Sequence, residues 1–221
     1  MFRDDTGELA EARRRLAWYP DDVWRYLLGC QWQRVAQLEP FVGRTGDVGD
    51  ELGSRLIAAS LVGDAMRLAF LIERQYAPYA KWFGTAFQRL TLAPALGGYL
   101  EAALVATGWR ERESALVTGF ERLGHASNAL EFADAVDPSP RRFYDRPYRV
   151  LDAHRFRDAL DRTIADPAVR AVIERVGWVG AVDQLSDCVD LLTDNDRIGG
   201  MIRYSEGEAS QNRSGSTAEW E

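Results

Sequence analysis

The apolar positions in the middle of the chain follow a helical period. They alternate steps of four and three residues, which places them on one face of a helix. The positions are Leu52, Leu56, Ala59, Gly63, Met66 and Phe70, and the polar Glu73 continues the same face. The opposite side, which includes Leu61, Ala65 and Leu68, is apolar too. A helix that is apolar on most sides is typical of a buried position, so we predict that this helix is central and packed on most sides.

Similar patterns predict further helices and no strand. Pro20 and the two acids after it are suited to a helix start, and this helix should run to about Leu38. A largely apolar stripe through Trp109, Leu116 and Phe120 predicts another long helix. Together with this one, the helices predicted after residue 80 cover residues 81–90, 94–106, 109–132, 152–164, 167–176 and 182–192. We therefore predict an all-α fold, a bundle of about seven to eight helices within residues 1–193.

Two segments lack this pattern. Residues 39–49 contain a proline and three glycines, which interrupt both helix and strand, so we interpret them as a connection between helices. Their glycine spacing matches neither a P-loop nor a dinucleotide-binding fingerprint. Residues 194–221 are rich in Ser, Gly, Glu and Asn, and we expect a disordered tail there because the segment can bury little apolar surface.

Composition and charge exclude several classes of protein. With 46% hydrophobic residues among 221, the chain can form a packed core. Its net charge of −7 argues against nucleic-acid binding, which needs clustered cations. Asp64 and Arg67 interrupt the most apolar stretch, which argues against a membrane span. Residues 1–5 are charged, unlike a signal peptide, so we expect a cytoplasmic location.

Cysteines and histidines are few. Cys30 and Cys188 lie in apolar helical contexts, and we interpret both as buried free thiols. His125 and His154 belong to no cluster with metal-ligand spacing, so we expect no metal site. Neither histidine has an obvious nucleophile beside it, and a nucleophilic triad is unsupported.

Lys81 is the only lysine among 27 cationic residues, and it lies in the most aromatic stretch of the chain. A compact ammonium has been kept where nearly every other cation is a guanidinium, which suggests a specific role. Pro78 ends the preceding helix and the next one begins close to Lys81, so free backbone amides would add to its attraction for an anion. We predict a phosphate site at Lys81, with Tyr79 and Trp82 as supports. The structural alternative is a lysine without function near a helix start.

A second candidate site is the loop at residues 141–149, where four arginines alternate with aromatic rings. Such a composition can stack a base and grip phosphate, with Arg141, Arg142 and Arg146 as candidate contacts. We favour the structural alternative, in which the aromatic rings pack into the helical core and the arginines form ion pairs with nearby acids.

A third candidate is a polar site containing Asp64, Arg67 and His125. Asp64 and Arg67 stand three residues apart on a helix and can pair, and a satisfied buried ion pair is the favoured interpretation. Asp64 also follows Gly53 and Ser54 at the distance seen in polymerase-β-type nucleotidyltransferases. The second acid of that motif is replaced by Met66, so we reject it as a catalytic magnesium site.

Several runs resemble an uncharacterised bacterial family whose members usually carry a nucleotidyltransferase-like domain followed by a helical domain of unknown function. The runs are LAWYP (16–20), VWRYLL (23–28), CQW (30–32), EPFVGR (39–44), GDELGSR (49–55), YAPYAKWFG (76–84), DRPYRVL (145–151) and VDQ (182–184). The resemblance covers about residues 8–192. In the family, the Gly-Ser and Asp-x-Asp residues lie upstream of the matched region, so we expect the catalytic half to be absent here.

The resemblance implies a function by analogy with similar two-domain nucleotidyltransferases, in which the helical domain closes over the nucleotide and supplies a lysine to the triphosphate. We therefore expect a nucleotide- or substrate-binding accessory domain that is catalytically incomplete alone. It would have no cofactor of its own, but could take a nucleoside triphosphate with Mg²⁺ when a separate catalytic domain completes the site. One alternative is a helical interaction module that forms a homodimer or pairs with a separate catalytic partner. The other is an enzyme of unfamiliar chemistry that uses His125, Asp64 or the arginine loop.

Overall fold

The structure, a computed structural model, describes residues 4–185. It confirms the all-α fold class. The helices are α1 (Glu8–Arg15), α2 (Asp21–Leu38), α3 (Phe41–Asp47), α4 (Glu51–Ile72), α5 (Ala80–Phe87), α6 (Ala93–Val105), α7 (Trp109–Asn128), α8 (His154–Asp161), α9 (Pro167–Val176) and α10 (Val182–Leu185). Cys188, the end of the helix predicted at 182–192, and the predicted tail lie outside the described residues.

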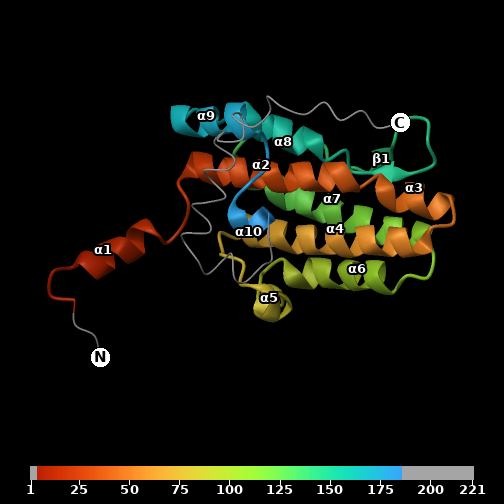
Figure 1. The fold of residues 1–221 in the computed structure, drawn as a ribbon, viewed down its shortest axis with the longest axis horizontal. Helices are drawn as coiled ribbons and strands as arrows, with labels where there is room; N and C mark the ends of the chain where they lie inside the picture. Colours follow the sequence, from red (N-terminus) through yellow and green to blue (C-terminus); the bar gives the residue numbers. More distant parts are fainter. Residues whose placement is uncertain (1–3, 186–221) are drawn as a thin grey trace, which may run out of the picture.

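The long helices run side by side (Figure 1). α4 packs against α2, α6 and α7, while α8 and α9 lie along α2. α3 covers one end of the bundle, and α5 lies beside α4 toward the other end. α1 projects away from the body and has no buried residue. None of the helices in the described part of the chain is both long and apolar enough to cross a membrane.

Local sequence signals explain where several helices begin and end. The Asp50 carboxylate accepts a hydrogen bond from the Gly53 N–H at 2.7 Å and caps α4. Asp166 caps α9 in the same way, with Pro167 in the first turn, where a missing N–H costs nothing. Just after α4, the Glu73 carboxylate accepts the N–H groups of Thr91 and Leu92, which ties the end of α4 to the start of α6.

The core has two parts. The larger cluster lies between α2, α4, α6, α7 and α8, and its largest fully buried side chains include Trp24, Trp32, Phe70 and Phe120. The smaller cluster lies between α2 and α9 and contains Tyr26, Leu27, Cys30, Ile164 and Val169. Cys30 is a buried free thiol, as predicted. Its pKa is raised to about 12 by burial, so the sulfur stays protonated and packs as an apolar group.

Arg112 is the one arginine that is fully buried among the described residues. Its guanidinium donates to Glu51 Oε2 at 3.1 Å and to Ser54 Oγ at 2.6 Å, both on α4. It also donates to the carbonyl of Ala106, just after α6, at 3.1 Å. These bonds pair the two terminal nitrogens of a buried charge and hold α4, α6 and α7 together at one end, whereas Arg112 Nε has no hydrogen-bond partner among the described residues.

Residues 39–49 do not form the simple connection that we predicted, because they contain helix α3. The two glycines inside α3 are needed for close packing. A Cβ atom at Gly46 would lie 2.3 Å from the side chain of Trp109, and one at Gly43 would lie 2.5 Å from Tyr148. Glycine normally weakens a helix, but here it allows α3 to approach α7 and the ring of Tyr148.

Two further expectations need correction. The chain contains a short antiparallel pair, β1 (Arg141–Arg142) with β2 (Arg149–Val150), because the ends of the arginine loop are drawn together against α7. The first half of α4 is not packed on all sides, since Leu52 and Leu56 are largely exposed. In that half, the described elements cover only the inner face of the helix.

Candidate functional site

Lys81 lies in the first turn of α5, as predicted, but the preceding helix α4 ends at Ile72 and not at Pro78. Tyr79 is the N-cap residue, and its side chain makes no capping hydrogen bond. Within residues 4–185, the Lys81 ammonium has no hydrogen bond or ion pair. It lies over the Trp82 ring, whose centroid is 5.2 Å from Nζ. Tyr79 and Trp82 are half exposed. The first turn of α5 therefore presents a free cation and two aromatic faces to solvent.

An aromatic pocket adjoins α5. Trp18, Tyr19 and Tyr76 pack edge to face or tilted, with centroids 5.0–5.1 Å apart. The pocket has a cavity volume of about 40 Å³, and it extends over Phe70 and Arg67 of α4. Tyr76 and Ala77 belong to the wall of the pocket and to the segment that leads into α5. The aromatic pocket and the Lys81 turn are thus neighbouring parts of one region.

Gln31 and Gln184 line the aromatic pocket and form a buried hydrogen-bond network with Asp64. Gln31 Nε2 donates to Asp64 Oδ1 at 2.9 Å, and Gln31 Oε1 accepts from Gln184 Nε2 at 3.1 Å. Gln184 also donates to the Leu27 carbonyl at 3.2 Å. All three side chains are buried. Because their donors are largely used within the chain, they hold α10 against α2 and α4.

Asp64 does not pair as predicted. Its carboxylate accepts a hydrogen bond from Arg34 Nε on α2 at 2.9 Å, and Arg34 is its partner instead of Arg67. Arg67 lies over the Phe83 ring, with its guanidinium carbon 5.2 Å from the centroid. The spacing along one helix allowed the Arg67 pair, but packing of α2 brought a competing arginine to the same carboxylate. Asp64 is therefore in an ion pair with a different partner, and the pair is not fully satisfied, because Asp64 Oδ2 is buried and has no hydrogen-bond partner within residues 4–185.

Free polar groups remain on the wall of the aromatic pocket. The indole N–H of Trp18 is buried and has no hydrogen-bond partner in the described part of the chain. Burial, with smaller contributions from Asp183 and Tyr76, raises the pKa of Tyr19 to about 12, so its phenol stays neutral. A neutral phenol and an indole N–H can both donate hydrogen bonds to a ligand.

The arginine loop lies at the other end of the bundle, beside α3 (Figure 1). Tyr148 is buried, and its hydroxyl donates to Asp47 Oδ2 at 3.1 Å. Arg141 pairs with Asp137 at 3.1 Å. Both contacts agree with the structural role that we favoured for this loop. The exposed Arg146 shares an open groove with Arg44, Phe143 and Tyr148.

The structure does not bring the remaining candidates together. His125 is exposed on α7, whereas Asp64 is buried between α2 and α4. Arg142 is exposed on β1. Within residues 4–185, no three His, Cys, Asp or Glu side chains are grouped so that they could hold a metal ion. The Lys81 turn and the arginine loop are likewise separate surfaces and cannot form one site.

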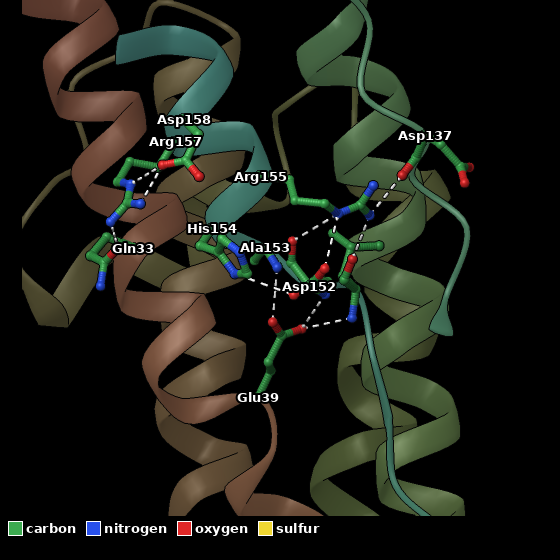
Figure 2. Close-up of polar contacts among 10 residues, drawn as sticks. Gln33, Glu39, Asp137, Asp152, Ala153, His154, Arg155, Arg157 and Asp158 are labelled. Carbon is green, nitrogen blue, oxygen red and sulfur yellow. Dashed lines mark hydrogen bonds and ion pairs between the residues drawn. The ribbon is translucent and has the colours of Figure 1, made fainter. Parts of the chain in front are cut away.

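Glu39 was not singled out from the sequence, and it has an unusual environment. Figure 2 shows its carboxylate beneath the turn that precedes α8, where it accepts backbone N–H groups of Leu151 at 2.7 Å and Ala153 at 2.9 Å. Burial raises its pKa to about 7, although these hydrogen bonds act in the opposite direction. Since both oxygens are bound to the chain itself, Glu39 holds this turn in place. Nothing in the local sequence reveals a contact that spans more than one hundred residues.

Comparison with known proteins bears on one part of this site. Residues 1–83 match a family model described as a domain of unknown function, DUF4037. No curated protein and no solved structure matches the chain. The matched segment contains Tyr79, Lys81 and Trp82, and it supplies every lining residue of the aromatic pocket except Asp183 and Gln184. His125 and the arginine loop lie outside it.

Proposed function

We propose that this chain is a helical accessory domain that binds a nucleoside triphosphate, or a similar small anion, at the Lys81 turn. It would work with a separate nucleotidyltransferase-like catalytic domain. The observation that carries the proposal is the ammonium of the only lysine, which has no hydrogen bond or ion pair within residues 4–185 and lies in the first turn of α5 beside exposed aromatic rings.

Charge and helix geometry both favour an anion at this turn. The first N–H groups of a helix have no partner within the helix, and the Tyr79 side chain does not cap those of α5. An ammonium nearby adds a full positive charge on a flexible stem. Phosphate oxygens could accept from both, as charge-assisted hydrogen bonds.

The base of a nucleotide would lie at the mouth of the aromatic pocket and not inside it. A cavity of about 40 Å³ has room for a few water molecules at most. The exposed rings of Tyr76, Tyr79 and Trp82 offer stacking faces outside it. Stacking of a base on an aromatic side chain contributes about 1–3 kcal/mol and tolerates different bases.

We assign catalysis to a separate domain. Nucleotidyl transfer needs paired carboxylates that hold magnesium against the triphosphate. The sequence contains half of the corresponding motif, and its acid, Asp64, is buried against Arg34 and Gln31. The magnesium would arrive with the nucleotide and bind carboxylates of the partner domain.

The test is calorimetric titration of the purified chain with ATP and the other nucleoside triphosphates, with and without magnesium. Lys81→Ala should weaken binding about tenfold or more, because a hydrogen bond to a charged group contributes about 1.5–3 kcal/mol. Lys81→Arg tests whether a compact ammonium is needed. Arg146→Ala is the matched control, since it removes an exposed cation at the other end of the bundle.

The outcomes separate the alternatives. Equal binding by the parent chain and Lys81→Ala, or no binding by the parent, would contradict the proposed site. Loss of binding in Arg146→Ala alone would move the site to the arginine loop. Nucleotide transfer by the purified chain, without any partner, would contradict the assignment of catalysis to a separate domain.

A specific observation favours the interaction module as the second candidate function. The first half of α4 exposes Leu52 and Leu56 on the outer side of the bundle, next to the exposed Val105 at the end of α6. Arg112 ties the start of α4 to the end of α6, and several large exposed apolar residues at one end of a bundle are typical of a contact with another protein.

A further inference from the structure

α4 and α6 form one outer face of the bundle. They run antiparallel and are held in line at both ends. Arg112 bonds Glu51 at the start of α4 and the Ala106 carbonyl just after α6, while Glu73 after α4 bonds the N–H groups that precede α6. Figure 1 shows the two helices side by side along one edge of the molecule.

The outer surface of this pair, which we call the α4/α6 face, is apolar and unusually exposed. Its large residues gather at one end. Leu52 is 71% exposed, Leu56 63% and Val105 77%. Single exposed leucines are common, but several together on neighbouring helices are typical of an interface.

The other part of the α4/α6 face carries small residues. Along α4, the stripe that begins with Leu52 and Leu56 continues with Ala59 and Gly63. Along α6, Val105 is followed toward the other end by small exposed residues. These are Ala102, Gly98 and Ala95. A Cβ atom placed on Gly63 or Gly98 would meet nothing within 4 Å. Large side chains therefore project at one end of the face, which we call the ridge, and small residues leave the surface lower at the other end, which we call the groove.

A ridge and a groove on the same face make it complementary to a copy of itself. Rotation by 180° about an axis that lies in the plane of the interface and crosses α4 at right angles near residues 57 and 58 brings the ridge of one molecule over the groove of the other. In this arrangement the two α4 helices are antiparallel, with Leu52 opposite Gly63 and Leu56 opposite Ala59. Pairing large with small residues is how helices interdigitate, and such a two-fold contact forms a closed dimer.

Charge also favours a second copy over a charged partner. Apart from Glu51, which is paired with Arg112, the exposed charged residues of α4 and α6 are one cation, Arg55, and one anion, Glu101. The face thus has no net charge, although the whole chain carries −7. Two such faces can meet without bringing together an excess of like charge, whereas a strongly basic or acidic partner would find no complement here.

We infer that the α4/α6 face is the interface of a two-fold homodimer, in which the Leu52 and Leu56 ridge of each copy packs into the Ala59 and Gly63 groove of the other. The dimer does not depend on nucleotide binding at Lys81, so either proposal can fail without the other.

The first experiment measures the molar mass of the parent chain and two variants by sedimentation equilibrium over a range of concentrations. Leu56→Glu places a charge in the interface and should raise the dimer dissociation constant about tenfold or more. Leu16→Glu is the control, because Leu16 is also largely exposed but lies outside the α4/α6 face. A dimer that is lost in Leu56→Glu and kept in Leu16→Glu supports the inference. A monomeric parent chain, or a dimer that Leu56→Glu leaves intact, overturns it.

The second experiment tests the register by exchanging a large and a small residue. Leu52→Ala alone should weaken the dimer by removing the ridge, and Gly63→Leu alone should weaken it by filling the groove. The double variant restores one large and one small residue at each contact, so it should dimerise better than either single variant. Circular dichroism confirms that each variant is folded. A double variant weaker than both single variants would contradict the antiparallel pairing of Leu52 with Gly63.

Discussion

Glu39 illustrates at the scale of single residues how burial and hydrogen bonding compete. Its carboxylate accepts backbone N–H groups at residues 151–153, which favours the charged form. Burial disfavours that form and outweighs the hydrogen bonds, so the pKa rises from 4.5 to about 7. The folded protein therefore binds a proton at Glu39 in a pH range where the unfolded chain has released it.

This proton makes stability depend on pH. A carboxyl group whose pKa is higher in the folded than in the unfolded state stabilises the fold below pH 4.5, and this contribution is lost as the pH rises through about 7. We expect the free energy of unfolding to fall over this range by about 3 kcal/mol from Glu39, at about 1.4 kcal/mol per pH unit. Urea unfolding of the parent chain at several pH values measures the slope.

Glu39→Gln provides the control for this prediction. The neutral amide cannot titrate, so the difference between the two stability curves isolates the contribution of Glu39 from other carboxyl groups, including Glu113, whose pKa burial also raises. The substitution also costs stability at every pH, because the amide presents only one oxygen to the backbone N–H groups. Parallel curves for the two proteins would show that Glu39 does not titrate between pH 4.5 and 7.

At the scale of elements, α3 shows that a glycine-rich segment can be a helix when packing requires it. The sequence of residues 39–49 predicted a connection between helices, since proline and glycine have poor helix propensity. The structure has a helix there because Gly43 and Gly46 let it pack against Tyr148 and Trp109 without a clash. Tertiary contact outweighed local preference.

Two glycine substitutions test this explanation. Gly46→Ala should destabilise the protein by about 1–3 kcal/mol, because its methyl group would overlap the side chain of Trp109. Gly84→Ala, in the exposed part of α5, should be neutral or stabilising by up to about 1 kcal/mol, since no atom lies within 4 Å of the added methyl group. Thermal and urea unfolding of both variants measure the difference. Equal effects at the two sites would mean that the α3 contact is looser than described.

At the scale of the whole molecule, α2 joins two cores of unequal size. Trp24, Leu28 and Trp32 enter the larger cluster, while Tyr26 and Leu27 face the smaller one with α9. Beyond α9, the smaller cluster is closed by the segment before α10. The ring centroids of Trp178 and Tyr26 lie 5.6 Å apart, and the Tyr26 hydroxyl donates a hydrogen bond to the Gly177 carbonyl at 3.1 Å.

This division predicts unequal local stability. Backbone amides of α9 should exchange with solvent faster than those of α4 and α7, because a small cluster with few partners opens more easily than the main core. Hydrogen exchange followed by mass spectrometry measures both regions in one experiment. Trp178→Ala should speed exchange in α9 about tenfold or more and leave α4 and α7 unchanged. Uniform acceleration across all helices would show instead that the two clusters unfold as one unit.

Much of the fold could be predicted from residue periodicity. α2, α5, α6, α7 and α9 begin at or within one residue of the predicted positions, because apolar spacing and capping residues are local signals. The prediction was wrong where a long-range contact decides the outcome. Arg34 replaces Arg67 as the partner of Asp64, and the first half of α4 is exposed although its pattern is apolar on most sides. Periodicity identifies which positions are apolar, but it does not say which of them find a partner.

Part of the candidate site could be predicted from the sequence. Lys81, Tyr79 and Trp82 were found by composition and by the predicted start of a helix, and both signals are local. Trp18, Tyr19 and Gln184 were assigned no place in a site, because the pocket that they line joins segments from both ends of the described chain.

The sequence by itself determined the all-α class, the positions of the long helices, the buried state of Cys30 and the place of Lys81 at a helix start. Each of these depends on residues within a few positions of one another. Only the tertiary structure decided the partner of Asp64, the burial of Glu39, the separation of Lys81 from the arginine loop and the exposure of the α4/α6 face. These properties depend on which distant segments meet, because burial and ion pairing are set by packing between helices and not by the pattern along any one of them.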